Sequence, residues 1–173
     1  MTVNILTGFE KINEIMNGCI NTEMVEDGLL SDVESFVNTY YNESQVEEPV
    51  IWMTQHPTTV EKNPDISKTA ILKTPFEFDC GVYEVEIEDG NIASQNLCNR
   101  VILSILKNYL TLQAQLLDGK RMIRNIELDT YSPLGYVPVE GKSDKVLITG
   151  VILNVYHMIN WQQCCHEINN GDD

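Results

Sequence analysis

The sequence predicts an α+β domain: a mostly antiparallel sheet of four or more strands, with N-terminal helices and one long central helix packed on one face. Residues 70–89 and, with an imperfect period, residues 122–131 alternate between apolar and polar residues, which is typical of strands that bury one face. Between them, apolar residues recur at helical spacing from Ile92 to Leu117. The 173 residues and 43% hydrophobic content indicate a single domain over 1–173 with a substantial core.

The N-terminal region, residues 1–45, is expected to be helical. Thr7 and Glu10 have the spacing of a capping box, which predicts a helix that ends near Gly18. Ser31 and Glu34 repeat this spacing, which predicts a second helix. The apolar stripe of that second helix comprises Leu30, Val33, Phe36, Val37 and Tyr40.

The middle of the chain predicts a short strand, a loop and a long strand. Residues 49–56 form an apolar run rich in β-branched and aromatic residues, which favours a buried strand, and the prolines in 57–68 predict a loop. Residues 70–89 predict one strand bent at Gly81, because glycine often marks a bulge. Its expected inner face comprises Phe76, Phe78, Cys80, Tyr83, Val85 and Ile87. Its expected outer face comprises Glu77, Asp79, Glu84, Glu86 and Glu88.

The long helix is expected to follow a turn at Asp89 and Gly90 and to stop at Asp118 and Gly119. Its apolar stripe comprises Ala93, Leu97, Val101, Ile105, Leu106, Tyr109, Leu112 and Leu116. A strand is predicted over 122–131, then a proline- and glycine-containing loop over 132–144 and a long strand over 146–161, with a second possible bend at Gly150. The polar residues 162–173 predict a flexible tail.

The net charge of −15, from 26 acidic and 11 basic residues, narrows the classes of partner. Proteins that bind nucleic acid or an anionic membrane present clustered Lys and Arg, so we expect no sequence-specific nucleic acid and no membrane as partner. Residues 1–48 hold ten acidic residues and one basic residue, whereas residues 90–145 hold seven basic and five acidic residues. This asymmetry suits head-to-tail contacts in a ring, although a chance distribution explains it equally well.

The cysteines favour a reducing compartment, because their number is five, none forms a C-x-x-C pair and no secretory signal is present. Cys80 and Cys98 lie on apolar faces and are expected in the core. A metal site could be assembled near the C-terminus, but its spacing is not that of a zinc site, and we expect free thiols there, with no metal and no cofactor. Its candidate ligands are His157, Cys164, Cys165, His166 and Glu167.

No catalytic pattern is found, and we expect no enzyme. The sequence contains no G-x-S-x-G and no phosphate-binding glycine loop. Glu77 with Asp79, and Glu84 with Glu86, are carboxylate pairs, but an exposed ladder does not separate their pKa values as general acid–base catalysis requires. The acidic face is instead a candidate contact or lumen surface, since a like-charged wall would let DNA pass without binding it.

Other interface candidates lie in the mildly basic half of the chain. Most aromatic residues are expected in the core, whereas Tyr131 and Tyr136, in or beside the proline-containing loop, are expected to be exposed anchors. The full set of candidate interface residues comprises Glu84, Glu86, Glu88, Arg121, Arg124, Tyr131 and Tyr136.

The element order and several local stretches resemble bacteriophage tail-terminator and minor tail proteins. The matching stretches are an acidic helical N-terminal region, PVIWMTQH, ILKTPFEFDCGVYEV, NIASQNLCNRVILSILKN and GVILNVYHMINW. The resemblance covers most of the chain, which departs from it in the second N-terminal helix and the His-Cys tail. It implies a non-enzymatic subunit of a homo-oligomeric ring, commonly a hexamer, that caps the tail tube and meets head-completion proteins. Such a protein would be found in the virion, or in the host cytoplasm during assembly.

A second hypothesis is a monomeric acidic binding protein that mimics DNA or inhibits a basic nucleic-acid-binding site. The mass in solution distinguishes the two hypotheses: a ring favours the tail protein, and a monomer that co-purifies with a basic protein favours the mimic.

Overall fold

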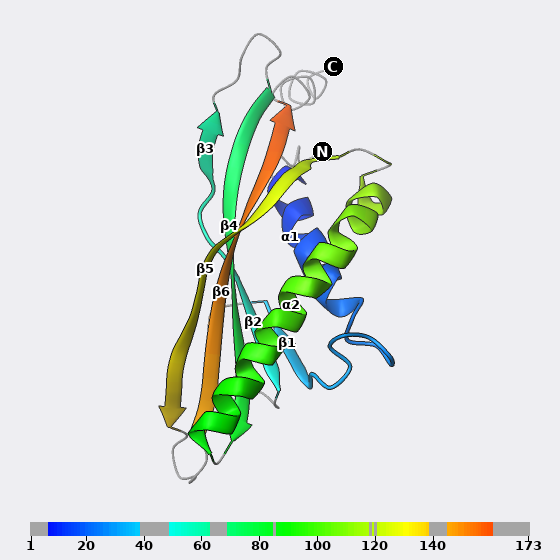
Figure 1. Cartoon of the computed structure of the whole chain (residues 1–173). Helices are drawn as coiled ribbons and strands as arrows, with labels where there is room; N and C mark the ends of the chain where they lie inside the picture. The colour runs from blue at the N-terminus through cyan, green and yellow to red at the C-terminus, as the bar shows by residue number, and fades with distance from the viewer. Residues whose placement is uncertain are drawn as a thin grey trace, which may run out of the picture.

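A computed structural model describes residues 7–38, 49–62, 69–84, 86–117, 119, 121–138 and 145–160, in which two helices lie against a six-stranded sheet (Figure 1). The element order is α1 (Thr7–Asn21), β1 (Ser35–Val37), β2 (Val50–Gln55), β3 (Thr59–Lys62), β4 (Thr69–Glu84), α2 (Ile87–Leu116), β5 (Ile123–Pro138) and β6 (Lys145–Asn160).

The sheet has the strand order β1-β2-β4-β6-β5, and β3 pairs with β4 beside β2. β4 and β6 form its centre: they pair antiparallel from Thr69 opposite Asn160 to Glu84 opposite Lys145. Only the short pairing of β1 with β2 is parallel among the described strands. The predicted α+β class with a mostly antiparallel sheet is therefore confirmed.

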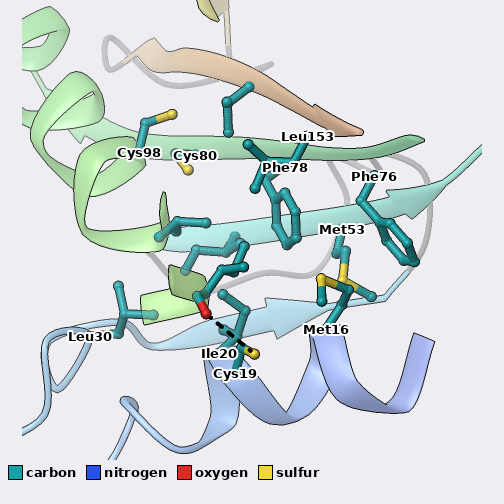
Figure 2. Close-up of a cluster of buried hydrophobic side chains, with 14 of the residues drawn as sticks. Met16, Cys19, Ile20, Leu30, Met53, Phe76, Phe78, Cys80, Cys98 and Leu153 are labelled. Carbon is teal, nitrogen blue, oxygen red and sulfur yellow. Dashed lines mark hydrogen bonds between the residues drawn. The ribbon is translucent and has the colours of Figure 1, made fainter. Parts of the chain in front are cut away.

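Both helices cover the same face of the sheet (Figure 1). Phe76 and Phe78 of β4 point from this face into a cluster that includes Met16 of α1 and Cys98 of α2, and Figure 2 shows part of it. The thiol of Cys19 donates a hydrogen bond of 3.9 Å to the carbonyl of Ile105, which links the two helices inside the core. Cys80 and Cys98 are buried, as predicted.

Gly81 does not mark a bulge in β4, contrary to the reason for which a bend was predicted there. Its pairing runs without a register shift to Val50 on one side and Ile148 on the other. A Cβ at Gly81 would lie 2.7 Å from Cζ3 of Trp52, so the glycine is needed where the indole ring lies against the strand.

The second N-terminal helix is also wrong where the structure describes it. Residues 22–34 form turns and irregular backbone, followed by β1. Asp27 has a φ of 67°, which a helix does not tolerate, and the amide of Leu30 donates to the carbonyl of Glu23 at 2.8 Å. A Cβ at Gly28 would lie 2.2 Å from that same carbonyl oxygen, so the turn requires glycine.

Several predicted boundaries shift. α2 begins at Ile87, so Asp89 and Gly90 lie inside a helix rather than in a turn. The loop predicted over 57–68 contains β3, and β5 continues to Pro138 through most of the loop predicted over 132–144. Residues 39–48, 63–68, 139–144 and the predicted tail 162–173 lie outside the described residues.

Candidate interaction surface

One flank of α2 is joined to the N-terminal region by a buried carboxylate. Glu23 accepts hydrogen bonds from Asn108 Nδ2 at 2.7 Å, from Lys107 Nζ at 3.0 Å and from the Leu29 amide at 3.1 Å. The Asn108 bond, followed by those from Lys107 and Leu29, lowers the pKa of Glu23 to about 2 despite its burial. The carboxylate is therefore charged and fully engaged within the chain.

Arg100 closes the same flank two helical turns nearer the start of α2. Its Nη1 donates to the carbonyl of Leu29 at 3.0 Å, and its guanidinium binds both carboxylate oxygens of Asp32. The Arg100 hydrogen bonds lower the pKa of Asp32. Arg100 and Lys107 thus engage Asp32 and Glu23 of the acidic N-terminal region within one chain.

The opposite flank of α2 faces β5 and touches it at separated points. The hydroxyl of Tyr131 donates to the carbonyl of Gln95 at 3.4 Å, and the amide of Ile123 donates to Gln113 Oε1 at 3.1 Å. Leu106 lies 11 residues after Gln95 and seven before Gln113. These spacings correspond to three and two helical turns, so Leu106 lies on the flank that faces β5.

Leucine side chains on this flank and on the adjoining outer face of α2 remain open to solvent. Leu106 is 50% exposed, and Leu103 and Leu110, at neighbouring helical positions, are 54% and 44% exposed. On β5, Leu128 is 57% exposed although it pairs with Leu153, whose side chain belongs to the core. We call Leu103, Leu106, Leu110 and Leu128 the α2–β5 apolar patch.

β5 is an edge strand with an unusual length for an open edge. Its 16 residues pair with β6 on one side, and no described strand pairs with its other side. Register shifts fall between Ile123 and Asn125, between Leu128 and Thr130, and between Pro133 and Gly135. Such irregularities are typical of edges that must not pair indiscriminately, and they leave the regular stretches 125–128 and 130–133.

The predicted acidic ladder does not form one strand face. β4 ends at Glu84, Glu86 is the N-cap residue of α2, and Glu88 lies in its first turn. Glu86 and Glu88 are exposed at this helix start, where negative charge is favourable. The hypothesis of a strand wall lined by all these acids is therefore wrong, and a lumen cannot be inferred from it.

The other predicted interface residues gather at β5. Arg121 precedes the strand and is exposed, and Arg124 is an exposed strand residue whose Nε lies 2.9 Å from Met158 Sδ. Tyr131 is half-buried because its ring packs against the core and its hydroxyl reaches α2. Tyr136 lies in β5, and its side chain is outside the described part. None of the four patch leucines was among the predicted interface residues. Leu106 belonged to the apolar stripe of the long helix and was expected to be buried.

The open face of the sheet carries a second polar group of residues. His56 Nε2 lies 2.7 Å from Glu77 Oε2. Asp79, two residues along the same face, has a buried Oδ1 without a hydrogen-bond partner. Burial and the charge of Glu77 raise the pKa of Asp79 to about 6. The carboxylate pair Glu77 and Asp79 is thus less solvated than the sequence indicated, and its members have different environments.

The candidate metal ligands are only partly within the described chain. His157 is buried on the helix-covered face, and its Nε2 lies 2.8 Å from Thr74 Oγ1. Burial lowers the pKa of His157 to about 4. Cys164, Cys165 and His166 fall outside the described residues. Among the described residues, no cluster of three or more His, Cys, Asp or Glu could hold a metal ion, and no helix is long and apolar enough to span a membrane.

No family model matches the chain, and no curated protein matches it in sequence. Among solved structures, a chain from the virion of a native gene transfer agent particle is similar over 82% of this chain and 93% of its own length, with 9% identity and a TM-score of 0.35.

Proposed function

We propose that the chain is a structural subunit of a virus-like particle, similar to a tail terminator, that forms a homo-oligomeric ring at the end of the tail tube and joins head-completion proteins. It would act in the virion, without catalysis or a cofactor, after a period in the host cytoplasm. The observation that carries the proposal is the open edge of β5 beside the α2–β5 apolar patch. An exposed edge and an exposed apolar patch are typical of a surface that another chain covers.

The distribution of unpaired charge supports head-to-tail contacts. Glu86 and Glu88 are exposed at the start of α2, whereas Arg121 is exposed shortly after its end. A helix of 30 residues separates these groups by about 45 Å. Charges of opposite sign at opposite ends of one subunit can meet between neighbours in a ring.

The DNA-mimic hypothesis has less support. A mimic needs a continuous surface of free carboxylates, yet Glu23, Asp32 and Glu77 are each engaged by a basic side chain or a histidine of the same chain. The displaced positions of Glu86 and Glu88 also remove the continuous strand ladder that would have offered such a surface.

The test is the location of the protein in particles made by cells that carry its gene. Density-gradient-purified particles would be digested for mass spectrometry and labelled with an antibody for electron microscopy, with a gene-deletion strain as control. We expect several copies per particle and label at the junction of tail and head. Absence from particles, together with recovery as a complex with a basic protein, would favour the mimic instead.

A further inference from the structure

We propose that β5 and the α2–β5 apolar patch bind a second copy of this chain, with the two β5 strands antiparallel around a two-fold axis. This dimer is the state of the free protein in solution. It goes beyond the proposed function, which concerns the assembled particle, because the open edge of β5 is covered before assembly begins.

The edge itself favours a second copy. The 16 residues of β5 contrast with the opposite side of the sheet, where β1 has three residues and β3 has four. In the described chain, a strand edge of matching length is therefore offered by β5 of another copy. A two-fold pairing matches it with itself, and such isologous contacts are the commonest in homo-oligomers.

Charge complementarity selects the antiparallel arrangement. The strand begins with the basic residues Arg121 and Arg124 and continues with the acidic residues Glu127 and Asp129, all four exposed. Antiparallel pairing brings the basic start of one strand beside the acidic middle of the other. A parallel pairing in register would instead place each charge beside its own copy, which is repulsive.

The regular stretch 125–128 restricts the register. Residues that face each other across the strands must point to the same side of the sheet, so the residue on the axis faces itself. An axis at Glu127 would place two carboxylates face to face. An axis at Ile126 places Asn125 of one copy opposite Glu127 of the other, and Asn125 already donates to Glu127 at 2.7 Å within one chain. We therefore infer an axis beside Ile126.

The apolar patch adds the area that a short ladder lacks. A two-fold axis perpendicular to the sheet keeps both α2 helices on the same face of the joined sheets. One flank of each helix faces its own β5, so Leu106 and Leu128 of both copies approach the same seam. Stable interfaces combine such an apolar centre with a polar rim, here supplied by the charges of β5.

The first experiment measures the mass of the full chain by sedimentation equilibrium over a range of concentrations. We expect a dimer whose dissociation constant rises at least about tenfold in Leu106→Glu and in Leu128→Glu, because each places a charge in the seam. Val25→Glu is the matched control, since Val25 is as exposed as Leu128 at 57% but lies in a turn after α1. Circular dichroism with thermal melting verifies that each variant folds.

The second experiment tests the antiparallel register by exchanging the pair that faces across the axis. Asn125→Glu should weaken the dimer, because it places a carboxylate opposite Glu127 of the other copy, and the double variant Asn125→Glu/Glu127→Asn should return it to within about threefold of the original, because the pair is restored with its members exchanged. A double variant without recovery would overturn the arrangement. A monomer at every concentration, or an assembly unaffected by both leucine variants, would overturn the interface. Neither outcome bears on whether the protein enters particles, which the labelling experiment decides.

Discussion

The two flanks of α2 differ in what completes them. On the flank that faces α1, Glu23 receives three kinds of donor and Arg100 binds Asp32, so polar groups of the same chain satisfy one another. On the flank that faces β5, contacts occur at Gln95 and Gln113, and leucines between them stay half-exposed. The first flank is therefore packed and hydrogen-bonded within the subunit, whereas the second has the exposed apolar composition of a surface that binds another chain.

Removal of the carboxylate that closes the α1 flank should have the largest effect on stability. Glu23→Ala leaves Asn108 and the Leu29 amide without their acceptor, and we expect a loss of about 3 kcal/mol in the free energy of unfolding. Urea denaturation at pH 7 measures it. Glu26→Ala is the control, since Glu26 is exposed nearby, and it should change stability by less than about 0.5 kcal/mol. Equal effects of the two variants would remove the contrast between the flanks.

The strand that pairs with β5, β6, should exclude water as well as the α1 flank does, and its buried residue His157 tests this. Its pKa is lowered from 6.5 to about 4 in the folded state, so the unfolded chain binds the proton more readily. The neutral imidazole contributes about 3 kcal/mol to the free energy of unfolding above pH 6.5, and this contribution is lost as the pH falls from 6.5 towards 4. We expect His157→Gln to flatten this part of the stability profile, measured by urea denaturation between pH 4 and 8. If the stability profiles of the original protein and of His157→Gln ran parallel between pH 4 and 8, His157 would be hydrated in the folded state.

Asp79 sharpens the comparison from the open face, because it lacks the donors that Glu23 has. Its pKa is raised from 3.8 to about 6, so the folded chain holds the proton more tightly, and stability falls as the pH rises through this range. Asp79→Asn should therefore stabilise the protein at pH 8 by about 1 kcal/mol, after allowance for its partial exposure. It should have a smaller effect at pH 4. Destabilisation at pH 8 would mean that the carboxylate is satisfied in a way this account omits.

The smallest effect on folding is expected in the patch itself. Leu106→Glu and Leu128→Glu should each change the free energy of unfolding of the monomer by less than about 0.5 kcal/mol, since both side chains are already half-exposed. Denaturation at a protein concentration below the dissociation constant measures this. A large loss would place these leucines in the core of the monomer and contradict the contrast between the flanks.

Much of the fold follows from local patterns, and the exceptions have physical causes. The alternation of Phe76, Phe78 and Cys80 correctly predicted a buried strand face. The same alternation continued through Ile87 and Glu88, where α2 has already begun. Glu88 and Asp89 in a first helical turn were the signal that could have placed this start correctly.

The remaining errors depend on tertiary contacts. The capping pattern at Ser31 and Glu34 lost to the turn that Glu23 organises through its contacts with α2, which no local pattern reports. Pro133 and Pro138 indicated a loop, but an edge strand tolerates proline. Leu106 was assigned to the core because it fits the helical spacing of the apolar stripe. Its exposure depends on how closely α2 approaches β5, which the sequence does not reveal.

Hydrogen–deuterium exchange at two protein concentrations tests the central claim most directly. If a second copy covers the β5 edge, amides of residues 125–132 should exchange more slowly in concentrated than in dilute protein, while amides of residues 22–34 on the α1 flank should not change. Slow exchange is expected because a paired edge amide must open before it exchanges. Equal exchange of β5 at concentrations on both sides of an observed dimer transition would contradict the account.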